Sequence, residues 1–131
     1  MDILYYFCNI CGKLITVVKN SGTPTICCGE VMKLLKPNTE DGAFEKHVPV
    51  VKQEDDILTV YVGETPHPMT EEHFIEWILV QTNHGIFKKH LSPSDNPVAK
   101  FKMEKDETFL NAFAYCNIHK LWKYPVMKNE G

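Results

Sequence analysis

The sequence has no long apolar run, no basic stripe and no acidic tail, and each absence excludes a class of protein. No segment offers the roughly 20 apolar residues that a membrane-spanning helix needs. The apolar start contains Asp2 and stops at Cys8, so we expect no signal peptide and a cytoplasmic protein that does not bind membranes. With 14 basic and 17 acidic residues the net charge is -3, which gives no indication of nucleic-acid binding.

The cysteines number five, and an odd count argues against a framework of disulfides. Disulfides are also rare in a reducing cytoplasm, so metal binding is the leading explanation for most of these thiols. The 131 residues have a hydrophobic content of 44%, which is enough for a packed core. That length fits one domain, or a small module followed by a domain of about 100 residues.

Two cysteine pairs, each followed by glycine, mark the first third of the chain: Cys8-x-x-Cys11-Gly12 and Cys27-Cys28-Gly29. Between them, the β-rich run Lys13–Val18 and the turn formers Asn20–Pro24 predict a hairpin that brings the pairs together. A module this small cannot bury enough apolar surface to fold alone, so a metal core is expected. Four thiolates suit zinc or a single iron, and ligand type alone leaves both open.

The rest of the chain consists of short predicted strands between turns, after the turn-rich stretch Lys36–Gly42, which we interpret as a linker. The predicted strands cover residues 47–51, 57–62, 75–82, 86–91 and 98–103. Residues 109–115 fit a helix or a strand. Six or seven strands at this spacing predict a mainly β protein with an immunoglobulin-like antiparallel sandwich. We therefore expect a metal-bound module at residues 1–36 and the sandwich at residues 37–131.

A second group of metal-ligating side chains lies in the sandwich region and consists of His47, His67, His73, Cys116 and His119. A lone histidine is more often a structural residue, and we expect His84 and His90 to lie on the surface. Four histidines that each lie beside a proline, a loop or an unpaired cysteine favour one shared centre. Imidazoles with one thiolate favour iron, copper or zinc. Zinc normally takes four ligands, whereas five protein ligands with one open octahedral position suit redox iron.

These motifs together resemble the desulfoferrodoxin family, in which a desulforedoxin module precedes a superoxide reductase (neelaredoxin) domain. Glu45–Pro49, His67–Met69 with His73, and Cys116–His119 look like the second domain, and the two cysteine pairs look like the first. The similarity covers essentially all 131 residues. One departure is Lys120, at a position where members of the family often have glycine.

The resemblance implies an oxidoreductase with two irons per chain. An FeS4 centre would be held by Cys8, Cys11, Cys27 and Cys28. A ferrous ion with one open position would be held by four equatorial imidazoles and one axial thiolate, from His47, His67, His73, His119 and Cys116. The implied reaction is the reduction of superoxide, with one electron and two protons, to hydrogen peroxide. A thiolate opposite the open position would push electron density toward a bound oxygen species.

The resemblance also assigns roles to two charged residues beside His47. Lys46 would attract the superoxide anion to a mildly anionic protein. Glu45 resembles the family carboxylate that occupies the open position in the ferric resting state. Spacing alone would leave both as exposed strand residues. A rubredoxin-like electron donor and a homodimer are implied as partners.

Two other classes of function remain open from the residues themselves. A rubredoxin-type electron carrier would explain the thiolate site but would leave four histidines and Cys116 without a role. A zinc-bound interaction module would need an exposed apolar stripe, and none is obvious in the sequence. Metal analysis separates the three, because one zinc and no iron would favour the interaction module.

Overall fold

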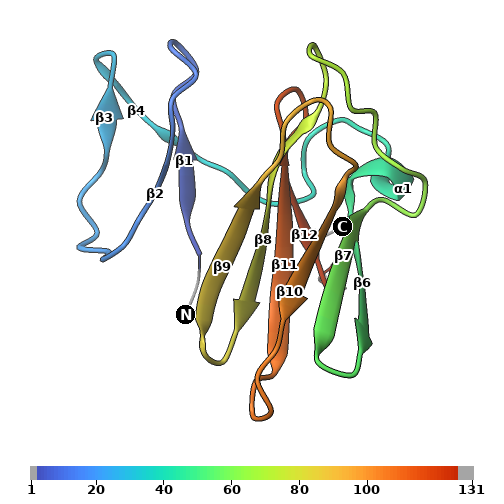
Figure 1. The fold of residues 1–131 in the computed structure, drawn as a ribbon. Coiled ribbons are helices and arrows are strands. Elements are labelled where there is room, and N and C mark those ends of the chain that lie inside the picture. The colour runs from blue at the N-terminus through green and yellow to red at the C-terminus, as the bar shows by residue number, and fades with distance from the viewer. Residues whose placement is uncertain (1–2, 127–131) are drawn as a thin grey trace. The chain divides into compact units, whose positions relative to one another are not determined.

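The computed structural model describes residues 3–126, which divide into two compact units between Lys36 and Pro37. In the first unit, β1 (Tyr5–Phe7) pairs antiparallel with β2 (Leu14–Thr16) and β5 (Lys33–Leu34). β3 (Ile26–Cys27) pairs with β4 (Glu30–Val31) in a separate short hairpin. The unit is therefore built from two small antiparallel hairpins and one returning strand, as Figure 1 shows.

The second unit is a sandwich of two antiparallel sheets (Figure 1). One sheet has the strand order β10-β7-β6 and the other has the order β12-β11-β8-β9. Their bounds are β6 (Pro49–Glu54), β7 (Ile57–Val62), β8 (Ile75–Thr82), β9 (Gly85–His90), β10 (Val98–Lys102), β11 (Phe109–Cys116) and β12 (Lys120–Tyr124). The predicted mainly β fold with an antiparallel sandwich is confirmed.

Alternating apolar residues explain why the two sheets pack together. Leu58, Val60 and Val62 of β7 point to one face and are almost fully buried. They meet the inward residues of β8 and β11, among them Val80 and Ala114. Because side chains alternate across a strand, the inward-facing residues of β7, β8, β10 and β11 meet in this shared core. The remaining residues are free to form the ends and edges of the sandwich.

Three local features differ from the sequence-based expectation. Residues 44–47 form a short helix, α1 (Phe44–His47), so that His47 ends a helix and does not begin a strand. β12 was not predicted. The stretch interpreted as a linker is instead paired with β12, because the Asn38 side chain accepts from Lys123 N–H at 2.9 Å and donates to Lys123 O at 3.1 Å. Asn38 thus covers the open edge of β12 as a strand would.

Helix α1 is a single turn, and no helix among residues 3–126 has the length and apolar composition to cross a membrane.

Candidate metal centres

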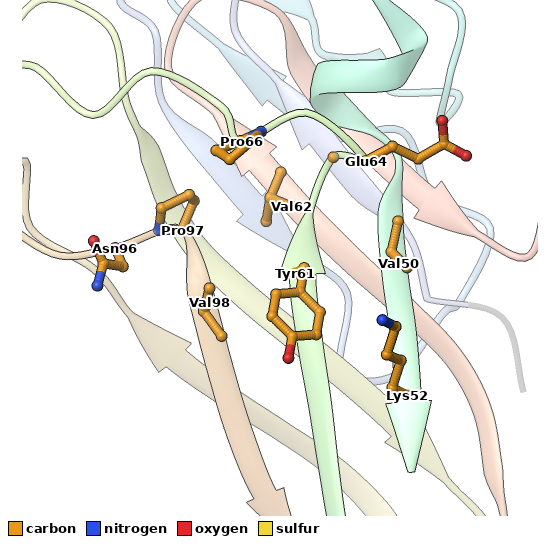
Figure 2. A pocket seen from close by; sticks show the side chains of 10 residues that line it. Val50, Lys52, Tyr61, Val62, Glu64, Pro66, Asn96, Pro97 and Val98 are labelled. Atoms are coloured by element: carbon orange, nitrogen blue, oxygen red, sulfur yellow. The ribbon is translucent and has the colours of Figure 1, made fainter.

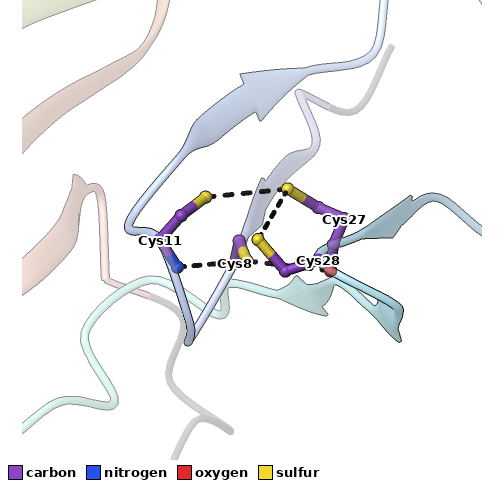
Figure 3. Close-up of side chains that lie close together, drawn as sticks. All are labelled: Cys8, Cys11, Cys27 and Cys28. Carbon is purple, nitrogen blue, oxygen red and sulfur yellow. Dashed lines mark hydrogen bonds between the residues drawn. The ribbon is translucent and has the colours of Figure 1, made fainter.

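Four thiols meet in the first unit, at the ends of its two hairpins. Cys8 and Cys11 lie in the turn after β1, and Cys27 and Cys28 lie at the turn between β3 and β4. Figure 3 shows the four side chains pointing toward one another. Their sulfur atoms all lie within 4.8 Å of one another. The two pairs come together as predicted, but the predicted hairpin across Asn20–Pro24 does not form, because β2 pairs with β1 and β3 pairs with β4.

The spacing of these sulfurs fits one tetrahedral metal ion. Metal–sulfur bonds of about 2.3 Å give a tetrahedron whose sulfur–sulfur edges are about 3.8 Å. The Sγ atoms of Cys11 and Cys27 are 3.7 Å apart, and those of Cys27 and Cys28 are 4.0 Å apart. Zinc and a single iron have the same preference for this geometry, so the spacing supports a metal without choosing between them.

The backbone around the thiols explains the two glycines. Gly12 and Gly29 have φ of 80° and 77°, a region that L side chains rarely adopt. Cys28 itself has φ of 53°, which is the twist that lets adjacent cysteines face one ion. Hydrogen bonds from the backbone N–H groups of Cys11 and Ile10 lower the pKa of the Cys8 thiol to about 6. The sulfur of Cys8 is thus prepared to carry negative charge.

Cys27 and Cys28 hold their protons in the absence of a cation. Hydrogen bonds with the sulfurs of Cys11, Cys8 and Cys27 raise the pKa of Cys28 to about 12. The pKa of Cys27 is raised as well, first by its contact with the Cys11 sulfur. Four thiolates this close together repel one another, so only a bound cation can keep all of them ionised.

A second cluster lies at one end of the sandwich and draws donors from four segments. His47 ends α1, His67 follows β7, His73 precedes β8, Cys116 ends β11 and His119 lies in the turn before β12. Donor atoms of His47, His67, His73 and Cys116 all lie within 4.8 Å of one another. His119 joins them, because its Nδ1 atom is 3.1 Å from His47 Nε2 and 3.9 Å from Cys116 Sγ.

The four imidazole rings are arranged as a square. Going round it, the ring centroids are 4.6 Å apart for His47 and His67, 4.6 Å for His67 and His73, 5.2 Å for His73 and His119, and 4.7 Å for His119 and His47. The diagonal from His47 to His73 is longer, at 6.3 Å. Metal–nitrogen bonds of about 2.1 Å place neighbouring nitrogens of such a square about 3.0 Å apart. The observed nitrogen pairs at 3.1 Å fit that value.

The hydrogen bonds of two rings show that a cation is required between them. His47 Nδ1 lies 2.8 Å from Ala43 O, and His67 Nδ1 lies 2.7 Å from Pro68 O. A carbonyl oxygen only accepts, so Nδ1 carries the proton in both rings and Nε2 presents a lone pair. The two Nε2 atoms nevertheless face each other at 3.1 Å. Two acceptors at that distance repel in neutral rings, and a metal ion between them removes the conflict.

His73 and Cys116 give independent support for a metal. Within residues 3–126, His73 Nε2 is buried and has no hydrogen-bond partner. Leaving a buried nitrogen unpaired is costly, so this atom is better explained as a metal ligand. Burial raises the pKa of the fully buried Cys116 thiol, while N–H groups of His119 and Ile118 oppose that shift. A metal would displace this proton.

Burial also keeps the imidazoles of His47, His67 and His73 neutral. It lowers the pKa of His47 and of His73, and it lowers the pKa of His67 to about 4. The neighbouring rings act in the same direction, because a second positive charge in the cluster is unfavourable. Neutral imidazole is the form that binds metals, so these rings are available as ligands at neutral pH.

This burial predicts a pH-dependent stability of the metal-free protein. Below the ordinary pKa of 6.5 the unfolded chain protonates His67, whereas the folded protein does not do so until about pH 4. The unfolded state therefore binds more protons, and the free energy of unfolding falls as the pH drops through this window. We expect His67 to contribute a loss of about 2 kcal/mol between pH 7 and pH 5. Urea unfolding of metal-free His67→Gln should show that much less pH dependence, while the surface variant His90→Gln should behave like the wild type.

Trp122 and Gly42 form a wall of the cluster. The Trp122 ring stacks on His47 at 4.7 Å, and its Nε1–H donates to His119 O at 3.0 Å. A β-carbon at Gly42 would lie 3.1 to 3.2 Å from Trp122, His119 and His47, so a side chain there would crowd all three rings. Lys120 has φ of 63°, a conformation that glycine adopts at less cost than lysine.

The charged residues of α1 lie at the rim of the cluster. Glu45 and Lys46 are both exposed. Burial is the main cause of the lowered pKa of both rings, but Glu45 opposes the lowering for His47 and Lys46 adds to the lowering for His73. His84 and His90 lie away from the cluster, on the β8–β9 turn and at the end of β9.

A surface groove over the β10-β7-β6 sheet contains none of the metal donors. This groove of about 500 Å³ lies over β6, β7 and β10, and Lys52 and Tyr61 lie along it (Figure 2). Its lining is largely aliphatic, with Val50, Val62 and Val98 beside them. This groove therefore adds no metal donor to the two clusters.

Comparison with known proteins agrees with both clusters. A family model described as desulfoferrodoxin matches residues 39–125, and a model of the desulfoferrodoxin N-terminal domain matches residues 3–35. A desulfoferrodoxin homolog of Archaeoglobus fulgidus is 43% identical over 90% of this chain and 93% of its own length. The desulfoferrodoxin of Nitratidesulfovibrio vulgaris is 44% identical over 90% and 92%.

A solved structure extends this similarity to the fold. The crystal structure of the superoxide reductase from Treponema pallidum superimposes with a TM-score of 0.77 at 32% identity, covering 94% of this chain and 98% of that one. The thiol cluster lies in the segment that the N-terminal model matches, and the histidine cluster lies in the segment that the larger model matches. On this evidence the chain belongs to the desulfoferrodoxin family.

Proposed function

We propose that this protein is a superoxide reductase, which reduces superoxide to hydrogen peroxide with one electron and two protons. The observation that carries the proposal is the square of four imidazoles beside one buried thiol. These five donors would hold one ion, and an ion that takes six ligands would keep one position for a small molecule. The likeness to the Treponema pallidum superoxide reductase supports the same reaction.

The two donor sets fit one Fe(Cys)4 centre and one Fe(His)4(Cys) centre per chain. The residues that we propose to hold the second iron are His47, His67, His73, His119 and Cys116. The first iron is assigned to Cys8, Cys11, Cys27 and Cys28. When bound, the iron of the second centre supplies the single electron that superoxide takes up.

The protein prepares this second centre in two ways. The carbonyl groups of Ala43 and Pro68 fix the tautomers of His47 and His67, so that both rings turn Nε2 inward. The backbone N–H of His119 points at Cys116 Sγ at 3.4 Å, which stabilises negative charge on the sulfur. The donors are therefore oriented before any substrate arrives.

Lys46 is proposed to attract superoxide to the centre. Its ammonium group is exposed, and its positive charge acts on His73. The chain carries a net charge of -3, so a local cation beside the site is needed to draw in an anion. Glu45, on the same turn, is proposed as the carboxylate that approaches the centre in its resting state.

Replacing Lys46 with alanine should slow the capture of superoxide by about tenfold and flatten its dependence on ionic strength. The reason is that the steering charge is lost while all metal donors remain. Pulse radiolysis at several salt concentrations measures both quantities. The control is Lys52→Ala, which makes the same change of net charge on β6. An unchanged rate and salt slope in Lys46→Ala would remove this residue from the mechanism.

The finer assignments are also proposals. A rubredoxin-like protein is the proposed electron donor, because a one-electron FeS4 protein matches the one-electron chemistry of the centre. We further propose a homodimer in the cytoplasm. Light scattering of the iron-loaded protein tests the dimer, and a mass equal to one chain would contradict it.

Product stoichiometry tests the proposed reaction. A reductase yields one hydrogen peroxide for each superoxide consumed and oxidises one equivalent of donor. Dismutation instead yields half as much peroxide, together with dioxygen. We expect two irons per chain and the one-to-one ratio. A preparation with one zinc, no iron and no superoxide consumption would instead favour the interaction module.

A further inference from the structure

The side chain of Asn117 links the two loops that carry His73 and Cys116. Asn117 Oδ1 accepts from Phe74 N–H at 3.0 Å, and its Nδ2 donates to Glu72 O at 3.0 Å. Its own backbone N–H donates to Phe74 O at 3.2 Å. All three bonds therefore go to the residues on either side of His73, more than 40 positions earlier in the chain.

These bonds continue the pairing of β8 with β11 beyond its regular end. The register between the strands shifts between Tyr115 and Cys116, and the last pair is Cys116 with Ile75. A primary amide has both a donor and an acceptor, as a peptide group does. Asn117 can therefore pair with the loop in place of the backbone that the shift has displaced.

His73 otherwise depends on a tight turn of its own. Its backbone N–H and C=O both bond to Thr70. This turn orients the backbone locally, but it does not fix the distance from His73 to the sulfur of Cys116. Among the described side chains near His73, that of Asn117 supplies the bridge that fixes this distance.

We propose that Asn117 is a positioning residue, which holds His73 and Cys116 at the mutual spacing that the second centre requires. It touches neither the metal nor the substrate, and it acts through the backbone of the His73 loop. The inference rests on the proposed use of His73 and Cys116 as ligands. Supporting groups that orient ligands typically contribute a factor of about 10 to 100 in metal affinity.

The test is a chelator challenge of the iron-loaded protein, with the FeS4 absorbance of the same molecule as an internal reference. Asn117→Ala should bind iron at the second centre about tenfold more weakly and shift its sulfur charge-transfer band. Asn117→Asp should lie between the wild type and Asn117→Ala, since a carboxylate can still accept from Phe74 N–H but cannot donate to Glu72 O. If Asn117→Ala does not fold, the iron affinity and spectrum of Asn117→Asp still test the proposal.

The matched control is Asn111→Ala. Asn111 lies on the same strand, β11, and its side chain donates to Gln81 Oε1 at 2.8 Å, so its loss also removes a bond between strands. Iron affinity in this variant should stay within about twofold of the wild type. Equal losses in both alanine variants, or wild-type affinity and spectrum in Asn117→Ala, would overturn the proposal. Failure of the wild type itself to bind iron at this centre would instead contradict the proposed function.

Discussion

Replacing Cys116 with serine is expected to abolish the sulfur-to-iron absorption of the second centre and to leave the FeS4 spectrum intact. Cys116 is fully buried, and its sulfur lies within 4.8 Å of donor atoms from four imidazoles. A serine hydroxyl is shorter and far harder to ionise than a thiol. Superoxide reduction should fall at least about 100-fold, the upper end of what an outer-shell change costs.

The converse variant provides the control for this experiment. Cys28→Ser removes one exposed thiol of the first cluster and should change the FeS4 spectrum alone. Visible spectra of the oxidised and reduced forms, with iron analysis, distinguish the two outcomes. If both absorption bands persist in Cys116→Ser, then Cys116 is not a ligand and the assignment of the second centre is wrong.

Replacing Gly63 with alanine is expected to destabilise the second unit by about 3 kcal/mol, because strain and overpacking add. Gly63 has φ of 87°, and its added β-carbon would lie 2.7 Å from Glu45 O and Lys46 C and would also collide with Thr65 O. All three contacts are with backbone atoms, which cannot be relieved by rotating a side chain. Relief requires a shift of α1, which carries Lys46 and His47, so iron binding should weaken as well.

Gly22 offers a control with the same backbone conformation. Its φ is 84°, and nothing lies within 4 Å of an added β-carbon. Gly22→Ala should therefore show only the conformational cost of about 1 to 2 kcal/mol, followed through the FeS4 absorbance of its own unit. Thermal unfolding of Gly63→Ala measures how far its loss of stability exceeds that of Gly22→Ala. A loss of stability no greater than that of Gly22→Ala would contradict the prediction, because it would show that α1 can shift without an energetic penalty.

The donors of both clusters could be identified from the sequence because cysteine and histidine are metal ligands and their spacing fits two shared sites. The strands of the sandwich were equally visible, since their apolar residues alternate. Helix α1 was missed because its four residues are too few to show a period. β12 was missed because a strand with Lys120 and Lys123 lacks the usual apolar alternation.

The residues that support the second cluster could not be found from pattern at all. Gly42 matters for the side chain that it lacks, which only the positions of His47, His119 and Trp122 reveal. Asn117 matters for its bonds to residues more than 40 positions away. Contacts of this kind depend on the closed fold, and neither composition nor spacing encodes them locally.

The two clusters differ in how much of the chain each one spans, and this difference fixes the order in which they form during synthesis on the ribosome. Cys8 to Cys28 leave the ribosome early and close over short loops, so the first iron can enter while translation continues. His47 to His119 cannot meet until nearly the whole polypeptide has emerged. A nascent chain stalled after residue 110 should therefore show the visible absorption of the FeS4 centre and lack that of the second centre.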